Sequence, residues 1–233
     1  MRIGWVCGLL LVGAMLTVGG PSATPVQEAF DVTVEDAVDV PTRTVSLEGT
    51  DYEVSAIARR ASGESVTVTV TGPAGEPYDL YLYDAARRIQ ATSRQRGSAE
   101  VTFQTDGLDP GTYVVAVYKQ GEFHDVFPVV VAGYDVTVSA PTEPVSDRTV
   151  SIPVQVTTRD GVGSPETVAV VLGDGNRTVR ETATATDGAE YVANVSVASL
   201  PPGAYRVYAV VTERRPTELD QLLGLSDGHT VTV

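Results

Sequence analysis

Apolar and polar residues alternate along most of the chain from residue 30 onward. Runs with this period of two include "SVTVTVT" at 65–71, "YDLYLYD" at 78–84, "TVSIPVQVTT" at 149–158 and "HTVTV" at 229–233. A period of two that is rich in valine and threonine is typical of β-strands that bury one face. The pattern therefore predicts an all-β chain.

One segment departs from this alternation. Residues 217–225 read "TELDQLLGL", with a threonine that can cap a helix and two acidic residues that favour its first turn. The segment is predicted to form one short helix.

Asp-Gly pairs separate the alternating runs. They stand at 106–107, 160–161, 174–175, 187–188 and 227–228. Asp-Gly tolerates the positive φ angles that tight hairpin turns require. Short strands divided by such turns predict a β-sandwich rather than an open sheet.

Three motifs occur twice in the same order. Leu-x-Pro-Gly-x-Tyr begins at Leu108 and again at Leu200, "FDVTV" at 30–34 recurs as "YDVTV" at 134–138, and "RTVSL" at 43–47 recurs as "RTVSI" at 148–152. The order indicates one duplicated unit, with the two copies at 30–133 and 134–233. Because Ala132-Gly133 is almost the whole linker, the tandem is expected to be stiff.

The Pro-Gly motif has a structural explanation in immunoglobulin-like (Ig-like) sandwiches. There, a tyrosine near the start of strand F bonds the backbone a few residues upstream, at the corner between the sheets. Tyr113 and Tyr205 stand at this place, and the second and fourth residues after each are expected to face the core.

The motif resembles Ig-like modules of microbial surface proteins, and the whole mature chain resembles segments of haloarchaeal secreted surface glycoproteins. The resemblance implies two tandem Ig-like β-sandwiches at an extracellular or cell-surface location. It implies no activity, because sandwiches host unrelated functions.

The N-terminus reads as a targeting segment. Residues 1–23 combine Arg2, an apolar run and small residues at the end, which predicts a secretory signal peptide. The alternative is an uncleaved N-terminal anchor, because the run is just long enough to span a membrane. The only cysteine, Cys7, lies in this run, so no disulfide or thiolate metal site is expected elsewhere.

The net charge of −14, with Lys119 as the sole lysine, argues against partners such as nucleic acid or an anionic membrane surface. An acidic surface poor in lysine also fits a halophilic protein, since molar salt screens repulsion among carboxylates. The alternative is an ordinary acidic secreted protein. Membrane contact is expected only through an uncleaved N-terminal segment.

The chain is predicted not to be an enzyme. Its two histidines, His124 and His229, belong to no zinc-protease motif, and no Gly-x-Ser-x-Gly elbow is present. His124-Asp125 is expected to be a solvated loop pair. Calcium at the Asp-Gly turns remains an alternative, but no Asp-x-Asp spacing supports it, so no cofactor is expected.

The only two asparagines, Asn176 and Asn194, both stand in Asn-x-Ser/Thr sequons, which predicts a glycoprotein. Asn176 is expected in a hairpin turn. Asn194 is expected in a strand, where it must face solvent to be modified.

A patch of tyrosines is the candidate contact surface. In "YDLYLYD" the leucines should face the core, so Tyr81 and Tyr83 face outward, and Tyr118 faces outward on the neighbouring strand. In the second unit, Ala169 and Val171 are expected at the places of Tyr81 and Tyr83. Exposed tyrosine is favoured at contact surfaces, although packing against the other unit or a loop would equally explain the patch.

These observations predict a secreted or cell-envelope structural or adhesive protein, such as a surface glycoprotein or a surface-layer accessory. Its partners would be other cell-envelope proteins or glycans. The alternative is a glycan-binding or protein-binding module of an exported enzyme or uptake system.

Overall fold

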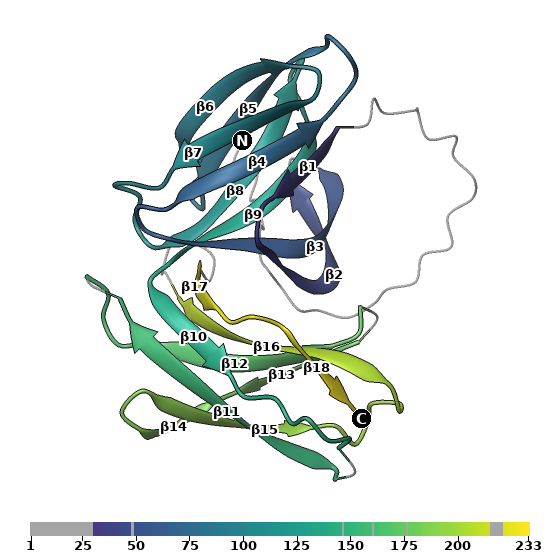
Figure 1. Ribbon diagram of the computed structural model, residues 1–233, viewed down its shortest axis with the longest axis vertical. Helices are drawn as coiled ribbons and strands as arrows, with labels where there is room; N and C mark the ends of the chain where they lie inside the picture. Colours follow the sequence, from purple (N-terminus) through teal and green to yellow (C-terminus); the bar gives the residue numbers. More distant parts are fainter. Residues whose placement is uncertain (1–29, 48, 146, 160, 176, 215–220) are drawn as a thin grey trace, which may run out of the picture.

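The computed structural model describes residues 30–233, apart from 48, 146, 160, 176 and 215–220, and every regular element in this range is a β-strand. These strands form two sandwiches stacked along the long axis (Figure 1). The predicted signal peptide or anchor, residues 1–23, lies outside the described residues. In the described part of the chain, no helix is long and apolar enough to cross a membrane.

The first sandwich consists of a three-stranded sheet, β1-β4-β7, and a six-stranded sheet, β2-β3-β9-β8-β5-β6. The strands are β1 (Asp31–Val34), β2 (Ala37–Leu47), β3 (Thr50–Ala61), β4 (Ser65–Thr71), β5 (Pro77–Asp84), β6 (Ile89–Arg96), β7 (Ala99–Gln104), β8 (Gly111–Lys119) and β9 (Glu122–Ala132). In Ig terms, β1, β4 and β7 are strands A, B and E, and β5, β8 and β9 are strands C, F and G.

The second sandwich repeats this arrangement with sheets β10-β11-β15-β14 and β13-β12-β16-β17, and β18 also pairs with β16. The strands are β10 (Tyr134–Val138), β11 (Thr149–Thr158), β12 (Thr167–Gly173), β13 (Thr178–Thr182), β14 (Thr184–Asp187), β15 (Glu190–Ser196), β16 (Ala204–Glu213), β17 (Gln221–Leu225) and β18 (His229–Thr232). Its sheets correspond to the ABED and C′CFG sheets of an Ig-type sandwich.

The first sandwich contains a hairpin, β2–β3, inserted between its strands A and B. Only the last four residues of β3, from Ala58 to Ala61, pair with β9, in parallel. The insertion corrects one sequence prediction: "RTVSL" at 43–47 lies in β2, whereas "RTVSI" at 148–152 leads into strand B, β11. The structural counterpart of β11 is β4, because β4 pairs with β1 as β11 pairs with β10.

The predicted helix over 217–225 is wrong in its described part. Residues 221–225 form strand β17, which pairs antiparallel with β16, and residues 217–220 lie outside the described residues. All five residues of β17 are buried, because Leu223 packs into the second core while Leu222 and Leu225 face the first sandwich. Burial on both faces explains why its leucines lack strand alternation.

The corner tyrosines make the same hydrogen bond in both sandwiches. The Tyr113 hydroxyl donates to the carbonyl of Asp109 at 2.7 Å, and the Tyr205 hydroxyl donates to the carbonyl of Pro201 at 2.8 Å. The predicted inward positions that follow are confirmed, since these four side chains are fully buried: Val115, Val117, Val207 and Ala209.

Gly133 alone separates β9 from β10, so strand G of one sandwich runs into strand A of the next. Its N–H donates to the Leu223 carbonyl at 2.8 Å, and its carbonyl accepts the Arg159 N–H at 3.0 Å. A Cβ at this position would lie 3.1 Å from the Cβ of Pro110. The connection is therefore fixed by hydrogen bonds and by close packing.

Removing either corner hydroxyl should destabilise the protein. Tyr113→Phe and Tyr205→Phe are each expected to lower the free energy of unfolding by about 1–3 kcal/mol, because a carbonyl loses its donor. Thermal unfolding by circular dichroism measures this. Tyr118→Phe, on a half-exposed ring, is the control, and corner variants that melt with that control would contradict the role of the corner.

Candidate contact surface

The structure gathers the three predicted tyrosines on the outer face of the six-stranded sheet and adds a phenylalanine. Ring centroids lie 5.5 Å apart for Tyr81–Tyr83, 5.6 Å for Tyr81–Tyr118, 5.2 Å for Tyr118–Phe123 and 5.9 Å for Tyr83–Phe123. Ile89 lies on the neighbouring strand β6, opposite Tyr83 of β5. These five residues are called the aromatic face.

The rings are half-buried rather than fully exposed, because they pack on one another and over the sheet. Ala116, opposite Tyr81, is fully buried within the same cluster, together with Tyr52 of the inserted hairpin. Ile89 is different: it is 54% exposed and is the one exposed large hydrophobic residue among those the structure describes. The face thus has a packed centre and an open apolar edge.

The rings do not share a plane. Their interplanar angles run from 55° to 81°, which is the tilted or edge-to-face packing that aromatic pairs prefer. Such a cluster presents ring edges and an uneven apolar surface. These four rings do not form a flat platform on which a sugar ring could stack.

The register shows which residues of the second sandwich occupy the same positions. Tyr81 stands opposite Ala116, three residues after the corner tyrosine of β8, and Val171 stands opposite Tyr208, three residues after that of β16. By the same comparison Gly173 corresponds to Tyr83. The expected correspondence of Ala169 and Val171 with the two tyrosines is therefore wrong by two residues. Val171, not Ala169, corresponds to Tyr81, and Gly173, not Val171, corresponds to Tyr83.

Ala169 instead matches Asp79, since each stands opposite the fifth residue after the corner tyrosine. Period-two alternation assigns a face but does not fix the register between strands C and F, and this explains the error. The remaining two rings also have counterparts: Val210 stands where Tyr118 stands, and Leu225, opposite Val210, stands where Phe123 stands.

In the second sandwich this equivalent face is buried beneath the first. One apolar cluster joins Ile57 and Val130 of the first sandwich to residues of the second. Those of the second are Ala169, Val171, Val210, Leu222 and Leu225. Gly173 leaves room for the hairpin, because a Cβ there would lie 2.8 Å from Cγ of Pro41. Glycine and aliphatic side chains at these positions accommodate a neighbouring sheet, where the first sandwich has aromatic rings.

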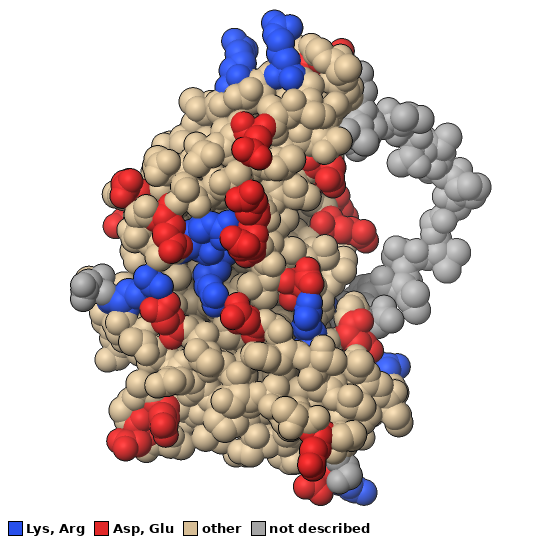
Figure 2. Space-filling model, viewed as in Figure 1, with Lys and Arg blue, Asp and Glu red and all other residues tan. Residues whose placement is uncertain are grey.

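Polar contacts surround this apolar interface. Thr112 Oγ1 accepts the Leu222 N–H at 2.9 Å, and Arg206 pairs with Asp39 of the hairpin at 2.5 Å. Figure 2 shows basic side chains lying among acidic ones at the level of this junction. The combination of an apolar centre and a polar rim is that of a specific protein interface.

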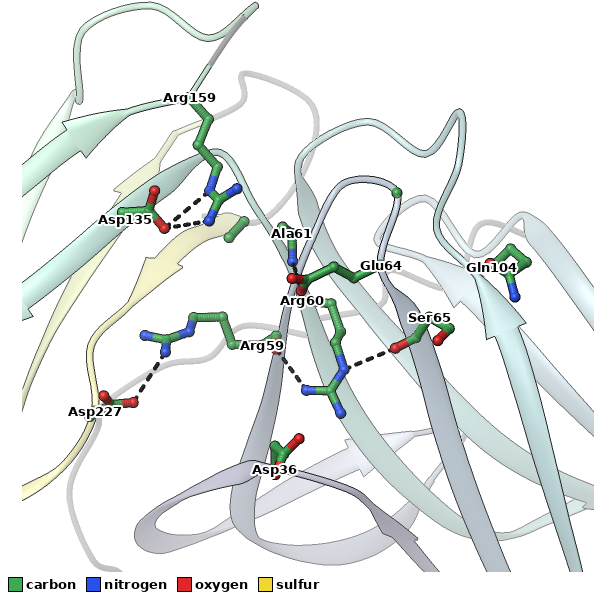
Figure 3. Close-up of a pocket in the computed structure, with 12 residues that line it drawn as sticks. Asp36, Arg59, Arg60, Ala61, Glu64, Ser65, Gln104, Asp135, Arg159 and Asp227 are labelled. Atoms are coloured by element: carbon green, nitrogen blue, oxygen red, sulfur yellow. Dashed lines mark hydrogen bonds and ion pairs between the residues drawn. The ribbon is translucent and has the colours of Figure 1, made fainter.

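A cleft of about 680 Å³ opens beside the junction, lined by charged residues from both sandwiches (Figure 3). Arg59 reaches across to the Leu225 carbonyl at 2.5 Å and to Asp227 at 3.1 Å. Arg159 pairs with Asp135 on the opposite wall. Both arginines donate to protein oxygens, and the bonds of Arg59 link the two sandwiches, whereas the Arg159–Asp135 pair lies within the second.

Arg60, a third arginine of the cleft, is buried, with 8% of its surface exposed. Its guanidinium donates to the carbonyl oxygens of Ser65 at 3.0 Å, Arg59 at 2.8 Å and Glu35 at 2.5 Å. The bonds to Ser65, at the start of β4, and to Glu35, just after β1, tie the end of β3 to the other sheet of the sandwich. The charge of Arg60 is thus compensated by backbone dipoles within the first sandwich.

His124 and Asp125, expected in solvent, lie half-buried inside β9. The His124 ring packs against Phe30 with centroids 5.3 Å apart, and Asp125 accepts the N–H groups of Val32 at 2.6 Å and Val126 at 2.9 Å. Burial raises the pKa of the Asp125 carboxyl above its usual value, partly offset by these hydrogen bonds. The pair fastens β1 to β9 and has a structural role.

His229 is exposed at the start of β18. Among the described residues, no group of three or more His, Cys, Asp or Glu side chains is arranged to hold a metal ion. Asn194 is exposed on β15, and its neighbours Ala193 and Val195 face the core. Asn176, the other predicted glycosylation site, lies outside the described residues.

Burial at the interface also affects Tyr208, which lies beside the apolar cluster that joins the sandwiches. Desolvation raises the pKa of its hydroxyl to about 12, although the charges of Arg43 and Arg180 pull the pKa in the other direction. Arg43 of the hairpin also contacts the Thr178 hydroxyl. The hairpin therefore covers this part of the second sandwich.

No protein-family profile and no curated protein matches the chain in sequence. A solved tetra-tandem repeat from the extending region of a large adhesion protein is 21% identical, over 76% of this chain and 48% of that one, with a TM-score of 0.30. A bacterial ice-binding adhesin is 16% identical over 81% and 71%, and the human OSCAR ligand-binding domain 14% over 75% and 93%, both with TM-scores of 0.25. This chain thus spans about half the length of the adhesion-protein repeat.

Thr112 tests the polar rim of the junction. Thr112→Val keeps the shape of the side chain but leaves the Leu222 N–H without its acceptor, and we expect the free energy of unfolding to fall by about 1–3 kcal/mol. Chemical denaturation measures the loss. Thr112→Ser retains the hydroxyl and is the control, so equal stability of the two variants would refute this contribution.

Tyr208 should make the protein sensitive to alkali. Its folded-state pKa of about 12 exceeds the ordinary value of 10.0, so the stability it contributes is complete below pH 10 and is lost as the pH rises from 10 to 12. Tyr208→Phe cannot ionise. Its free energy of unfolding should therefore decline less than that of the parent between pH 9.5 and 11.5, by about 2 kcal/mol, as urea titrations at both pH values would show. An equal decline would contradict the assignment.

Proposed function

We propose that the chain is a structural or adhesive module of the cell envelope, whose two sandwiches act as one stiff unit and whose aromatic face is the contact surface. The proposal rests on one observation. The aromatic face of the first sandwich occupies the same positions in the fold as the face of the second sandwich on which the first sandwich packs. One position in the Ig-like fold thus serves as a docking site within the chain and stays open in the first sandwich.

Stiffness supports a structural role. A one-residue linker, an apolar interface and hydrogen bonds through Thr112 and Arg59 hold the sandwiches in one orientation. Interfaces between linked units that are this apolar restrict their relative motion. A module of this kind holds its contact surface at a fixed distance and direction from its point of attachment.

The chemistry of the face favours a protein partner over a glycan. Tilted aromatic rings beside an exposed isoleucine match the apolar centre of a protein–protein contact. The alternative of a sugar-binding module would be better served by coplanar rings. The signal-like segment at 1–23 and the sequons at Asn176 and Asn194 support an extracellular location and glycosylation as parts of this proposal.

Two exposed positions on β6 test the face without disturbing its packed centre. Ile89→Glu with Thr92→Glu adds two charges beside Tyr83 and Tyr81, and we expect the share of protein recovered with envelopes of the native host to fall about tenfold, because charges in an apolar contact must be desolvated. Fractionation with mass spectrometry measures this share.

The matched control is Thr137→Glu with Thr184→Glu, which adds the same charge to exposed strands of the second sandwich. Retention of the β6 variant in the envelope fraction at the level of this control would rule out the face as the contact. Both variants should melt within a few degrees of the parent, since all four positions are exposed.

A further inference from the structure

We infer that the partner of the aromatic face is the same face on a second copy of this chain, so that two copies pair around a twofold axis. This inference rests on the proposed function, because it names the occupant of the contact surface. It follows from the position of the face, from its continuity with the internal interface and from its composition.

The aromatic face occupies a position at which this fold already packs against a sheet. Four residues of the second sandwich lie where the first sandwich packs on it, and each has a counterpart in the register of the first sandwich: Val171 corresponds to Tyr81, Gly173 to Tyr83, Val210 to Tyr118 and Leu225 to Phe123. The internal interface shows that the outer face of the CFG sheet in this chain packs against another sheet. The rings prevent the same mode of docking, because bulky groups fill the space that Gly173 leaves for the hairpin.

The face also continues the internal interface along the same strands. On β8 the outer surface runs from Thr112, bonded to Leu222, through Ala116 to Tyr118. On β9 it runs from Val130, in the interface cluster, through Val126 to Phe123. One apolar strip therefore begins under the second sandwich and ends in the aromatic face.

The composition of the face points to self-pairing. Ile89 is the one exposed large hydrophobic residue in the described part of the chain, and the same face on a second copy offers it an apolar surface to pack against. Beside the rings, Asp79 and Arg94 form a pair at 3.1 Å, and Arg96 is the next residue of β6 on the same face. When two copies meet across this face, Asp79 of each copy can pair with Arg94 of the other, so these ion pairs would bridge the copies.

The geometry predicts a closed and weak dimer. A twofold contact uses the same patch on both copies, so the assembly stops at two. The face spans four strands at about 4.8 Å between neighbours, roughly 15 Å across, which places the contact at the small end of specific interfaces. We expect a dissociation constant of about 10–100 μM, sufficient for chains concentrated on a surface.

Sedimentation velocity of the purified secreted chain, over about 1 μM to 1 mM, tests the pairing. The parent should shift from monomer to dimer, Ile89→Glu with Thr92→Glu should weaken the dimer at least tenfold, and Thr137→Glu with Thr184→Glu should leave it unchanged. A parent that stays monomeric throughout, or a β6 variant that dimerises like the control, would overturn the inference.

A second readout locates the contact directly. Pyrene attached at Thr92→Cys should show excimer emission that rises with concentration, because twofold pairing brings the two labels onto one interface. The same label at Thr137→Cys should show none. Equal excimer emission from both sites would overturn the inference, since it would place the association elsewhere or in the label itself.

The two proposals fail differently. A monomeric chain whose envelope attachment still depends on Ile89 and Thr92 overturns self-pairing and leaves the face as a contact for a different protein. A chain that dimerises through the face yet stays in the envelope fraction when the face is charged supports self-pairing and overturns the proposed function.

Discussion

The packing of the first sandwich onto the outer face of β12, β16 and β17 is the contact on which the rest of the structure depends. It buries apolar residues on both sides, with Pro41 of the hairpin fitting over Gly173. Thr112 and Arg59 then fix the register of the two bodies through bonds to the backbone of β17. Because the connection is Gly133 alone, this contact and the chain path have to agree, and the two sandwiches keep one orientation.

The outer face of the CFG sheet is covered differently in the two sandwiches. In the second sandwich, glycine and aliphatic residues on the CFG face admit a neighbouring sheet, and the hairpin that covers them is an insertion found between strands A and B of the first sandwich. In the first sandwich the same positions hold four aromatic rings, and two of them, Tyr83 and Phe123, pack with Tyr52 of the hairpin in the cluster that buries Ala116. The rings lower the cost of leaving this face uncovered by a second sheet, while Ile89 keeps its edge apolar.

Much of the fold could be predicted from the sequence, because alternation and turn chemistry are local. The core positions after each corner tyrosine, the outward Tyr81 and Tyr83 and the near-absence of a linker all follow from short patterns. The features that failed depend on partners far along the chain. Strand β17 resembles a helix because it is buried on both faces, and "RTVSL" resembles strand B although it lies in a hairpin. Phe123 was missed because no sequence rule fixes the register between strands F and G.

The passage of β9 into β10 has a mechanical consequence. A pull applied between the ends of the chain travels along β9 and enters β10 without an intervening coil that could extend first. The end of β3 lies parallel to β9 from Ala58 to Ala61, so tension loads those hydrogen bonds in shear and they have to yield together rather than one at a time. Two sandwiches joined in this way are expected to resist stretching as one unit.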